Sequence, residues 1–253
     1  MRALKELVAW LERAGCDEIY LIDNDSRYEP LRDYLKGLPH RVIQLDRNYG
    51  HNALWHAPGI FELTRGRRFV YTDPDIIPDE TCPPDAISRF SELLDRWRLN
   101  KAGFGLRIDD IPDHYRYKPE VLVSERGNWE WPLAKGVYFA PIDTRFAVYR
   151  EGSGPRPHDG IRTGPPYVAH HDSWYLDLDN LADDDLFYAQ RIAAEPWDGQ
   201  VFHWADAAPT EAMWTAQASV GRAYRAGPVR RRVTQLRWWL YGRRALRADT
   251  TSD

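Results

Sequence analysis

Short apolar segments alternate with helical segments through residues 1–110, and this alternation limits the folds that are open to the chain. Segments of this kind, strand and helix in turn, form βαβ units and a mostly parallel sheet. The sequence therefore predicts an α/β fold in which helices flank such a sheet. The expected strands are 19–22, 41–45, 69–72 and 102–106, and the expected helices are the N-terminal segment that stops at Gly15, then 28–37, 52–64 and 84–98.

Polar clusters follow each of the four expected strands. They occupy 23–26, 46–52, 73–75 and 107–110. Sheets of parallel strands bind ligands at the carboxyl ends of the strands, where the loops meet. We therefore expect the four clusters to line one crevice.

The pattern changes after residue 112. Two short strands are expected at 136–140 and 144–149, and the Gly- and Pro-rich segment 151–166 is typical of a mobile loop, either a lid or a plain surface connection. We therefore divide the chain into 1–110, 111–205 and a C-terminal helical tail, 206–253, that is basic and rich in Trp.

Composition excludes several classes of protein. The formal net charge is −4 at pH 7, which gives no reason to expect a nucleic-acid partner. Cys16 and Cys82 lie far apart and form no CxxC pair, so a reducing cytoplasm fits better than a disulfide framework. No apolar run approaches the roughly 18 residues of a membrane span. We expect a cytoplasmic protein.

Asp73-Pro74-Asp75 is the motif with the clearest chemistry. Two carboxylates one residue apart at the end of a strand can point at a single hard cation, and Mg²⁺ or Mn²⁺ prefers such oxygen ligands. Pro74 stiffens the turn because its ring fixes φ. An apolar strand precedes the motif and Ile76-Ile77-Pro78 follows it, so it is not an ordinary polar loop.

A family resemblance rests on several segments in order. Ile22-Asp-Asn-Asp-Ser26, the turn Asn48-Tyr-Gly50 and a strand that runs into Asp73-Pro-Asp75 together resemble the GT-A glycosyltransferases, in particular the bacterial family-2-like enzymes. Segments 103–115, 140–150 and 162–175 are similar to one subgroup of them. The resemblance implies a nucleotide-diphosphate sugar donor, a divalent metal (Mn²⁺ or Mg²⁺) and a role in polysaccharide or glycoconjugate assembly.

The same resemblance implies roles for individual residues. It makes 1–110 the half that binds the nucleotide-sugar and 111–205 the half that binds the acceptor and carries catalysis. Asp75 is favoured over Asp73 as the direct metal ligand, and His171 is favoured over His170 as an added one. The implied nucleotide-binding residues are Asp23, Asn24, Asn48, Gly50, Asn52 and Asp73, and the implied metal ligands are Asp73, Asp75 and His171.

The catalytic base is less clear from the sequence. An inverting transfer needs a carboxylate that takes the proton of the acceptor hydroxyl, and a retaining transfer needs a different arrangement. Asp109 and Asp110 follow the fourth strand, Glu130 lies between Trp129 and Trp131, and Asp143 lies between two strands. Each of these four carboxylates also fits a structural role, as a cap or as an ordinary surface group. The sequence therefore leaves all four as candidates for the base.

One departure from the family concerns the start of the fold. A GT-A domain usually begins with a strand that forms part of the nucleotide pocket, whereas this sequence starts with the helix that would follow it. We therefore expect either that the start site is set too late or that the sheet lacks an edge or central strand, the usual first one. An unpaired strand edge favours self-association, so a homo-oligomer is expected as well.

Other interpretations stay open for the tail and for the activity. The basic segment Arg222–Arg247, with Trp238-Trp239-Leu240-Tyr241, would either touch an anionic membrane near a lipid-linked acceptor or pack on the protein. For the activity, one alternative is a catalytically impaired relative of the family that binds nucleotide-sugars or saccharides. A nucleotidyltransferase is a further alternative, but it needs a Gly-rich phosphate loop near the first strand, and the sequence has none.

Overall fold

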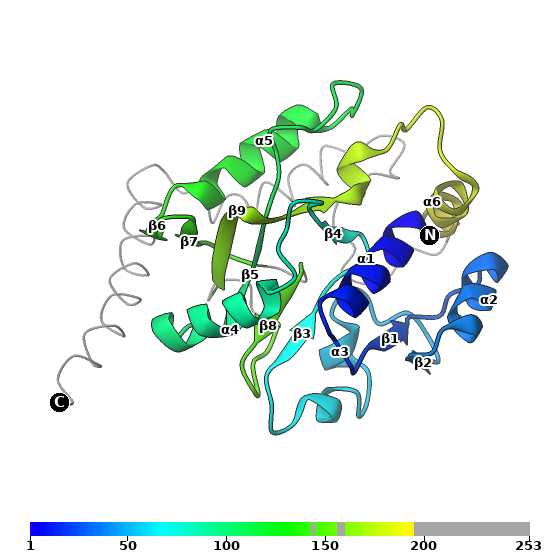
Figure 1. The fold of residues 1–253 in the computed structure, drawn as a ribbon. Helices are drawn as coiled ribbons and strands as arrows, with labels where there is room; N and C mark the ends of the chain where they lie inside the picture. Colours follow the sequence, from blue (N-terminus) through cyan, green and yellow to red (C-terminus); the bar gives the residue numbers. More distant parts are fainter. Residues whose placement is uncertain (143–144, 156–159, 195–253) are drawn as a thin grey trace, which may run out of the picture.

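The computed structural model describes residues 1–142, 145–155 and 160–194, and these residues form an α/β fold with a central sheet flanked by helices (Figure 1). The expected fold class is thereby confirmed. The elements are α1 (Arg2–Arg13), β1 (Tyr20–Asp23), α2 (Glu29–Gly37), β2 (Arg41–Gln44), α3 (Ala53–His56), η1 (Phe61–Thr64), β3 (Phe69–Tyr71), β4 (Ile76–Pro78), α4 (Ala86–Trp97), β5 (Lys101–Leu106), α5 (Lys118–Arg126), η2 (Gly127–Trp129), β6 (Pro132–Ala134), β7 (Val137–Phe139), β8 (Ala147–Tyr149), β9 (Gly160–His171), η3 (Asp172–Tyr175) and α6 (Asp183–Ala194).

The described part of the central sheet contains seven strands in the order β3-β8-β5-β9-β7-β6, with β4 paired to β9 outside this path. Only β5 and β9 run parallel within it, and its other pairs are antiparallel. The expectation of mostly parallel pairing is therefore wrong for this sheet. Parallel neighbours need a long crossover, whereas a tight turn such as 135–136 between β6 and β7 reverses the chain.

β1 and β2 form a separate parallel pair, joined by the crossover helix α2. Figure 1 shows this pair at one end of the molecule, next to α2. Within the described residues no strand hydrogen-bonds it to the central sheet. The expected absence of one strand and the expected self-association stay predictions.

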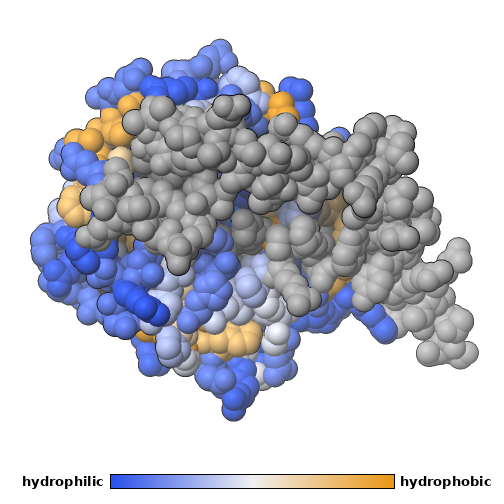
Figure 2. Space-filling model, turned by 180° about the vertical axis from the view of Figure 1, so that it is seen from behind, coloured by the Kyte–Doolittle hydropathy of each residue, from blue (hydrophilic) through white to orange (hydrophobic). Residues whose placement is uncertain are grey.

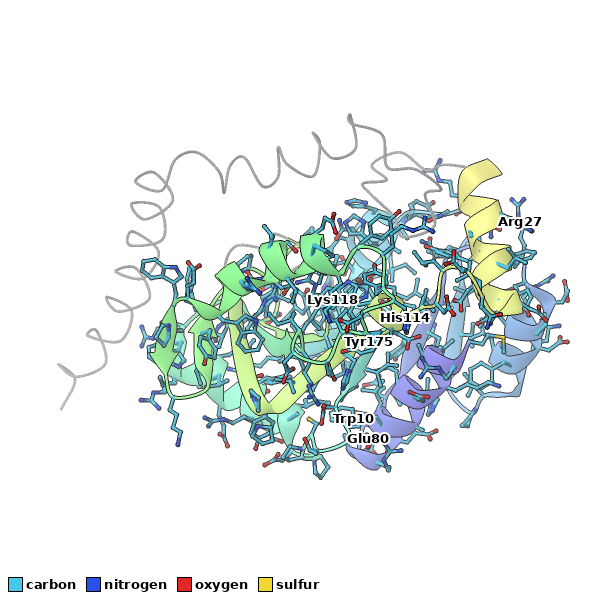
Figure 3. All side chains as sticks on the ribbon, turned by 90° about the horizontal axis from the view of Figure 1, so that it is seen from above. Trp10, Arg27, Glu80, His114, Lys118 and Tyr175 are labelled. Carbon is cyan, nitrogen blue, oxygen red and sulfur yellow. The ribbon has the colours of Figure 1, made fainter. Side chains whose placement is uncertain are left out.

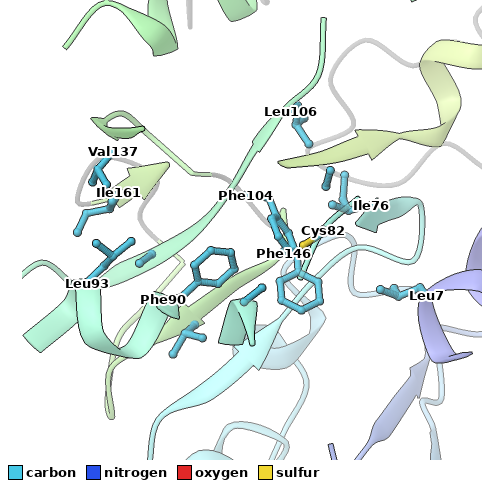
Figure 4. Packing of buried hydrophobic residues seen from close by; sticks show 14 of the residues in the cluster. Leu7, Ile76, Cys82, Phe90, Leu93, Phe104, Leu106, Val137, Phe146 and Ile161 are labelled. Carbon is cyan, nitrogen blue, oxygen red and sulfur yellow. The ribbon is translucent and has the colours of Figure 1, made fainter. Parts of the chain in front are cut away.

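Aromatic rings form the centre of the core, between α4 and the sheet (Figure 4). Phe90 on α4 meets Phe104 on β5 edge to face, with the ring centroids 4.8 Å apart. Trp10 on α1 makes a similar contact with Phe146 at 5.6 Å, so α1 is tied to the same core. Burying each such side chain contributes roughly 1.5–3 kcal/mol of stability.

The helix expected over 52–64 is broken into α3 and η1. Pro58 has no backbone N–H and disfavours a helical conformation at the residue before it, and Ala57 is accordingly extended, with ψ 132°. Gly59 then adopts φ +77°, which takes the chain out of the helix. The interruption was readable from the sequence as Ala-Pro-Gly.

The Gly- and Pro-rich segment 151–166 is only partly a loop, because Gly160 begins the long strand β9. This strand lies between β5 and β7 in the sheet. A Cβ atom at Gly160 would lie 2.7 Å from the carbonyl oxygen of Ala140, so the glycine permits a close approach of neighbouring backbone. The interpretation of 151–166 as a lid is therefore wrong for its second half.

Figure 2 shows the face of the molecule opposite to that of Figure 1. The coloured part of Figure 2 is mainly hydrophilic, with small separate hydrophobic areas. Val123, Leu186 and Tyr188 are among the exposed large hydrophobic residues. No helix among the described residues has the length and apolar character needed to cross a membrane. The basic tail 206–253 lies outside these residues, so its membrane contact stays a prediction.

Substituting Gly103 tests the packing of β5 against β8. A Cβ atom there would lie 2.1 Å from the carbonyl oxygen of Phe146 and 2.8 Å from Cα of Ala147, both backbone atoms that cannot move without separating the strands. We expect Gly103→Ala to lower the free energy of unfolding by roughly 1–3 kcal/mol, measured by urea denaturation.

Gly37→Ala is the matched control. Nothing lies within 4 Å of a Cβ atom at this position, so the same chemical change adds no clash. Equal free energies of unfolding for the two variants would contradict the close approach of β8 to Gly103.

Candidate functional site

The side chain of Asn24 joins the loop after β1 to the loop after β2. Its Nδ2 donates to Oδ1 of Asn48 at 2.7 Å and to the carbonyl oxygen of Gly50 at 3.1 Å. Its Oδ1 accepts a hydrogen bond from the backbone N–H of Tyr49 at 2.7 Å. Gly50 has φ +75°, a left-handed conformation that glycine adopts without strain. The structure therefore brings together Asn24, Asn48 and Gly50, all three expected at the nucleotide.

Asp23 and Asn52 lie at the edges of this pair of loops. Asp23 is buried, and its Oδ1 accepts a hydrogen bond from the N–H of Ser26 at 3.0 Å, which closes the turn after β1. Asn52 precedes α3, and its Nδ2 is 2.9 Å from Nε2 of His51. Oδ1 of Asn52 is buried and has no hydrogen-bond partner in the described part of the chain. Such an orphaned acceptor is costly, and a ligand donor would satisfy it.

Asp75 and His171 meet because β4 pairs with β9. Ile76 lies opposite His171 in the antiparallel register, and the N–H of Asp172 donates to the carbonyl oxygen of Asp75 at 2.8 Å. Oδ2 of Asp75 is 3.4 Å from Nδ1 of His171. The structure thus places His171, rather than His170, beside the second carboxylate of the Asp-Pro-Asp turn.

His171 is held by its neighbours in η3. Its ring stacks on Trp174 with the centroids 4.9 Å apart, and Oγ of Ser173 is 2.5 Å from its Nδ1. Burial lowers the pKa of His171, although the charge of Asp75 acts in the opposite direction. A neutral imidazole is the form that binds metal ions.

Asp73 lies on the same turn but does not complete a cluster. Its carbonyl oxygen accepts hydrogen bonds from Thr72 Oγ1 at 2.9 Å and from the N–H of Ile76 at 3.4 Å. In residues 1–142, 145–155 and 160–194, no group of three or more His, Cys, Asp or Glu side chains is arranged to hold a metal ion. Of the three expected ligands, Asp75 and His171 lie within ion-pair distance of one another.

α6 is tied to the loop after β1 by an ion pair. Nη2 of Arg191 pairs with Oδ2 of Asp25 at 2.7 Å. Figure 3 shows Arg27, from the same loop, beside α6. Nothing in the sequence pointed to α6.

Tyr71 makes the corresponding link on β3. Its hydroxyl donates to the carbonyl oxygen of His51 at 2.8 Å, which ties β3 to the loop after β2. Burial and then the nearby charge of Asp73 raise the pKa of Tyr71 above its usual range. The loops after β1 and β2 and the strand β3 are therefore tied together by hydrogen bonds. That all four polar clusters line one crevice stays a prediction.

Asp109 and Asp110 belong to a different group of side chains, centred on Arg107. Nε of Arg107 is 3.3 Å from Oδ1 of Asp109 and 3.3 Å from Oδ2 of Asp110. The hydroxyl of Tyr175 donates to Oδ1 of Asp110 at 2.6 Å and lies 2.9 Å from Nδ1 of His170. Neighbouring residues in a strand direct their side chains to opposite faces, so His170 and His171 serve separate groups.

Asp79 anchors the group around His170. It is 4% exposed, and its Oδ2 lies 2.7 Å from Nη1 of Arg107 and 2.9 Å from Nε2 of His170. Burial alone would raise the pKa of Asp79, but hydrogen bonds from Thr81, Arg107 and His170 hold it well below its usual range. The expectation from the sequence did not include Asp79, since a single acid after a strand carries no motif.

Glu130 is exposed at the end of η2. The preceding ring, Trp129, packs into the sheet: its Cη2 would be 2.5 Å from a Cβ atom at Gly105, and its centroid is 5.3 Å from that of Tyr138. Trp129 is therefore a packing residue here. Asp143 lies outside the described residues.

A buried ion cluster surrounds Glu125 on α5. Oε2 of Glu125 is 2.6 Å from Nη1 of Arg162, and Oε1 is 2.9 Å from Nη1 of Arg145. Asn128 donates to Oε2 at 3.0 Å. Burial alone would raise the pKa of Glu125, but the two guanidinium groups and these hydrogen bonds lower it to about 2. The charges of Arg145 and Glu125 also act on the pKa of His171, after burial and Asp75.

Comparisons with known proteins add little to this description. No protein-family model matches the chain, and no curated protein matches it. A mannosyltransferase from Pyrobaculum calidifontis, solved in complex with GDP-Man and Mn²⁺, is similar in structure with a TM-score of 0.45 and 13% sequence identity, over 98% of this chain and 81% of that one. Similarity at this level assigns neither a family nor an activity to the chain.

The low pKa of Glu125 predicts how stability depends on pH. A carboxylate whose pKa is lowered from 4.5 to about 2 by folding stabilises the folded protein above pH 4.5, and this contribution is lost as the pH falls toward 2. We expect roughly 3 kcal/mol of the free energy of unfolding to be lost over this range through Glu125. The free energy of unfolding of Glu125→Gln, measured by urea denaturation over the same pH range, should not show this loss.

Glu120→Gln, at an exposed position on the same helix, is the control. Its free energy of unfolding should fall between pH 4.5 and 2 as that of the wild type does. A Glu125→Gln profile with the same loss between pH 4.5 and 2 would mean that the buried ion cluster does not contribute.

Proposed function

We propose that the chain is a metal-dependent glycosyltransferase, which moves a sugar from a nucleotide-diphosphate donor to a saccharide or lipid-linked acceptor. The observations that support the proposal are the approach of Asp75 to His171, with Oδ2 and Nδ1 3.4 Å apart, and the hydrogen bonds by which Asn24 ties the loops after β1 and β2 together. An oxygen donor and an imidazole nitrogen suit Mn²⁺, and such ions keep other positions for water and phosphate oxygens.

Asp75 and His171 would hold the metal ion, and Asp73, on the same turn as Asp75, would contribute its carboxylate to the same site. When bound, the ion would stabilise the negative charge of the diphosphate. We propose that Asn24, Asn48 and Gly50 form the wall of the nucleotide pocket. Their mutual hydrogen bonds fix the two loops before a ligand arrives, which reduces the entropic cost of binding.

Two further residues complete the proposed nucleotide pocket. The unpartnered Oδ1 of Asn52 would accept a hydrogen bond from the base or the ribose. Asp23 would act through the turn after β1, which it closes by its bond to Ser26. A nucleotide that met these groups would satisfy the orphaned acceptor without moving the loops.

The transfer itself exchanges one bond for another. The bond between the anomeric carbon and the diphosphate oxygen breaks, and its electron pair leaves with the nucleoside diphosphate. The acceptor oxygen forms the new bond to the anomeric carbon, and its proton passes to a carboxylate. Asp109, Asp110, Glu130 and Asp143 remain the candidates from the sequence.

Asp172 is an additional candidate for the base. It follows His171 directly, and burial raises its pKa, as does the charge of Asp75, while its ion pair with Arg2 acts in the opposite direction. A carboxyl group with a raised pKa in the proposed site is better matched to proton transfer at neutral pH than an ordinary surface carboxylate. Asp110, in contrast, lies in the group around Arg107 and Tyr175.

Location and assembly remain proposals too. We propose that the enzyme works in the cytoplasm, with the tail 206–253 as a contact to the inner face of the membrane when the acceptor is lipid-linked, and that it forms a homo-oligomer.

The alternative function is that of a relative that binds nucleotide-sugars or saccharides without turnover. The two functions differ in one measurable respect, which is slow hydrolysis of the donor.

Replacing Asp75 tests the proposed function. We expect Asp75→Asn to weaken Mn²⁺-dependent binding of the donor by at least roughly tenfold, because a charged ligand to the ion is lost. Isothermal titration calorimetry with UDP-, GDP- and dTDP-sugars, with and without Mn²⁺, measures the effect, and donor hydrolysis measured in parallel separates an enzyme from a binding protein.

Asp33→Asn, an exposed aspartate on α2 that pairs with Lys36, is the control and should bind as the wild type does. If donor binding by Asp75→Asn keeps its dependence on Mn²⁺ unchanged, the assignment of the metal site is wrong.

A further inference from the structure

Asp25 lies in the turn after β1 and has an unusual backbone conformation. Its φ is +65°, in the left-handed region that aspartate tolerates better than most residues but less well than glycine. The same turn is closed by Asp23, whose Oδ1 accepts the N–H of Ser26 at 3.0 Å. Asn24, which ties the loops after β1 and β2 together, directly precedes Asp25. The conformation of Asp25 therefore helps to set where the backbone holds Asn24.

Arg191 on α6 contacts Asp25 at two points. Its Nη1 donates to the backbone carbonyl oxygen of Asp25, and its Nη2 pairs with Oδ2 of the same residue at 2.7 Å. A guanidinium group is a rigid planar fork, so two bonds to one residue fix both the carbonyl group and the side chain of that residue relative to α6. A change of backbone conformation at Asp25 would break at least one of these bonds.

A ring contact holds the same face of α6 against this part of the chain. Phe187 lies on α6 one turn before Arg191, and its ring centroid is 5.1 Å from that of Tyr28. Tyr28 directly precedes α2, three residues after Asp25. Residues four apart on a helix lie on one face, so a single face of α6 carries both contacts. An apolar and a charged interaction therefore dock α6 on the segment 25–28.

We propose that α6 is a latch on the loop after β1: Arg191 holds Asp25 in the left-handed conformation that presents Asn24 to the loop after β2, and docking of α6 and binding of a nucleotide therefore favour one another. The inference rests on the proposed function, because it assigns a means of regulation to the same site. A ligand that binds the ordered loops more tightly also stabilises the contacts that order them. Arg191 is accordingly a positioning residue, which acts on the nucleotide through Asp25 and Asn24.

Arg27 makes a contrasting contact with the same carboxylate. Its Nη2 is 3.2 Å from Oδ2 of Asp25, but its side chain is 57% exposed, whereas that of Arg191 is 21% exposed. An exposed pair two residues apart is screened by water and joins the loop to itself rather than to another element. Arg27 is therefore a matched control for Arg191, since each is an arginine beside one and the same carboxylate.

The first measurement needs no ligand. The N–H of Tyr49 donates to Oδ1 of Asn24 at 2.7 Å, so hydrogen exchange of this amide reports whether the two loops are joined. Exchange is followed by NMR in the full chain, for the wild type, Arg191→Gln and Arg27→Gln, and thermal unfolding shows whether each variant is folded. We expect Arg191→Gln to speed exchange at Tyr49 roughly tenfold, and Arg27→Gln to leave it within about twofold of the wild type.

The second measurement is the affinity for UDP, GDP and dTDP with Mn²⁺, by calorimetry. We expect Arg191→Gln to weaken binding roughly five- to thirtyfold, and Arg27→Gln to bind as the wild type does. Arg191→Lys keeps the charge but loses the fork, so its affinity should be intermediate, and it provides both measurements if the Gln variant does not fold.

Two further comparisons separate the latch from a general effect on stability. Asn at position 25 tolerates the left-handed conformation but carries no charge, so Asp25→Asn and Arg191→Gln form a double-mutant cycle. The double variant should lose no more affinity than the weaker-binding single variant, because Arg191 acts through Asp25. Saturating nucleotide should also slow exchange of the α6 amides in the wild type but not in Arg191→Gln, whereas a residue that only stabilises the fold would leave this slowing in place.

Three results would overturn the inference. Equal exchange at Tyr49 in Arg191→Gln and Arg27→Gln would mean that α6 does not hold the loop, whether or not a nucleotide binds. Additive losses in the double-mutant cycle would mean that Arg191 does not act through Asp25. Slowing of α6 exchange by nucleotide in Arg191→Gln, as in the wild type, would remove the coupling.

Failure of the proposed function gives a different result. A wild-type chain that binds none of the three nucleotides with Mn²⁺ would remove the proposed function, and with it the coupling of α6 to a nucleotide. Exchange at Tyr49 would still decide whether Arg191 holds the loop after β1.

Discussion

Hydrogen bonding between β4 and β9 is the constraint on which the proposed site depends. β4 follows the Asp73–Asp75 turn directly, and its antiparallel register with β9 sets Ile76 opposite His171. A shift of this register by one residue would turn His170 toward Asp75 instead, since side chains alternate along a strand. β9 is itself held between β5 and β7, so the geometry of the Asp75–His171 pair is fixed by the whole central sheet.

Buried charge is the second feature that organises the molecule. Asp79 is compensated by Arg107 and His170, and Glu125 by Arg145 and Arg162. Buried ions are tolerated only when they are paired, so each group fixes its residues in one arrangement at a cost in desolvation. Both groups include residues of β9, and they connect that strand to the loops after β4 and β5 and to α5.

The strands and polar turns of the N-terminal half were predictable because they depend on local patterns. Apolar runs that end in polar clusters gave β1, β2, β3 and β5 nearly in place, and the loops around Asn24 and Gly50 do meet. Pairing in the second half was not predictable in this way. α5, β6 and the long β9 lie in segments where Gly, Pro and charged residues hide the period of two or of 3.6 residues.

By itself, the sequence determined the α/β class and the place of the carboxylates after β3, because strand periodicity and a polar turn are properties of neighbouring residues. Only the tertiary structure decided which strands pair, which histidine lies beside Asp75, and which arginines surround Glu125. These facts depend on hydrogen bonds and ion pairs between residues far apart in the chain. Such contacts follow from how the segments pack together, and no short stretch of sequence encodes them.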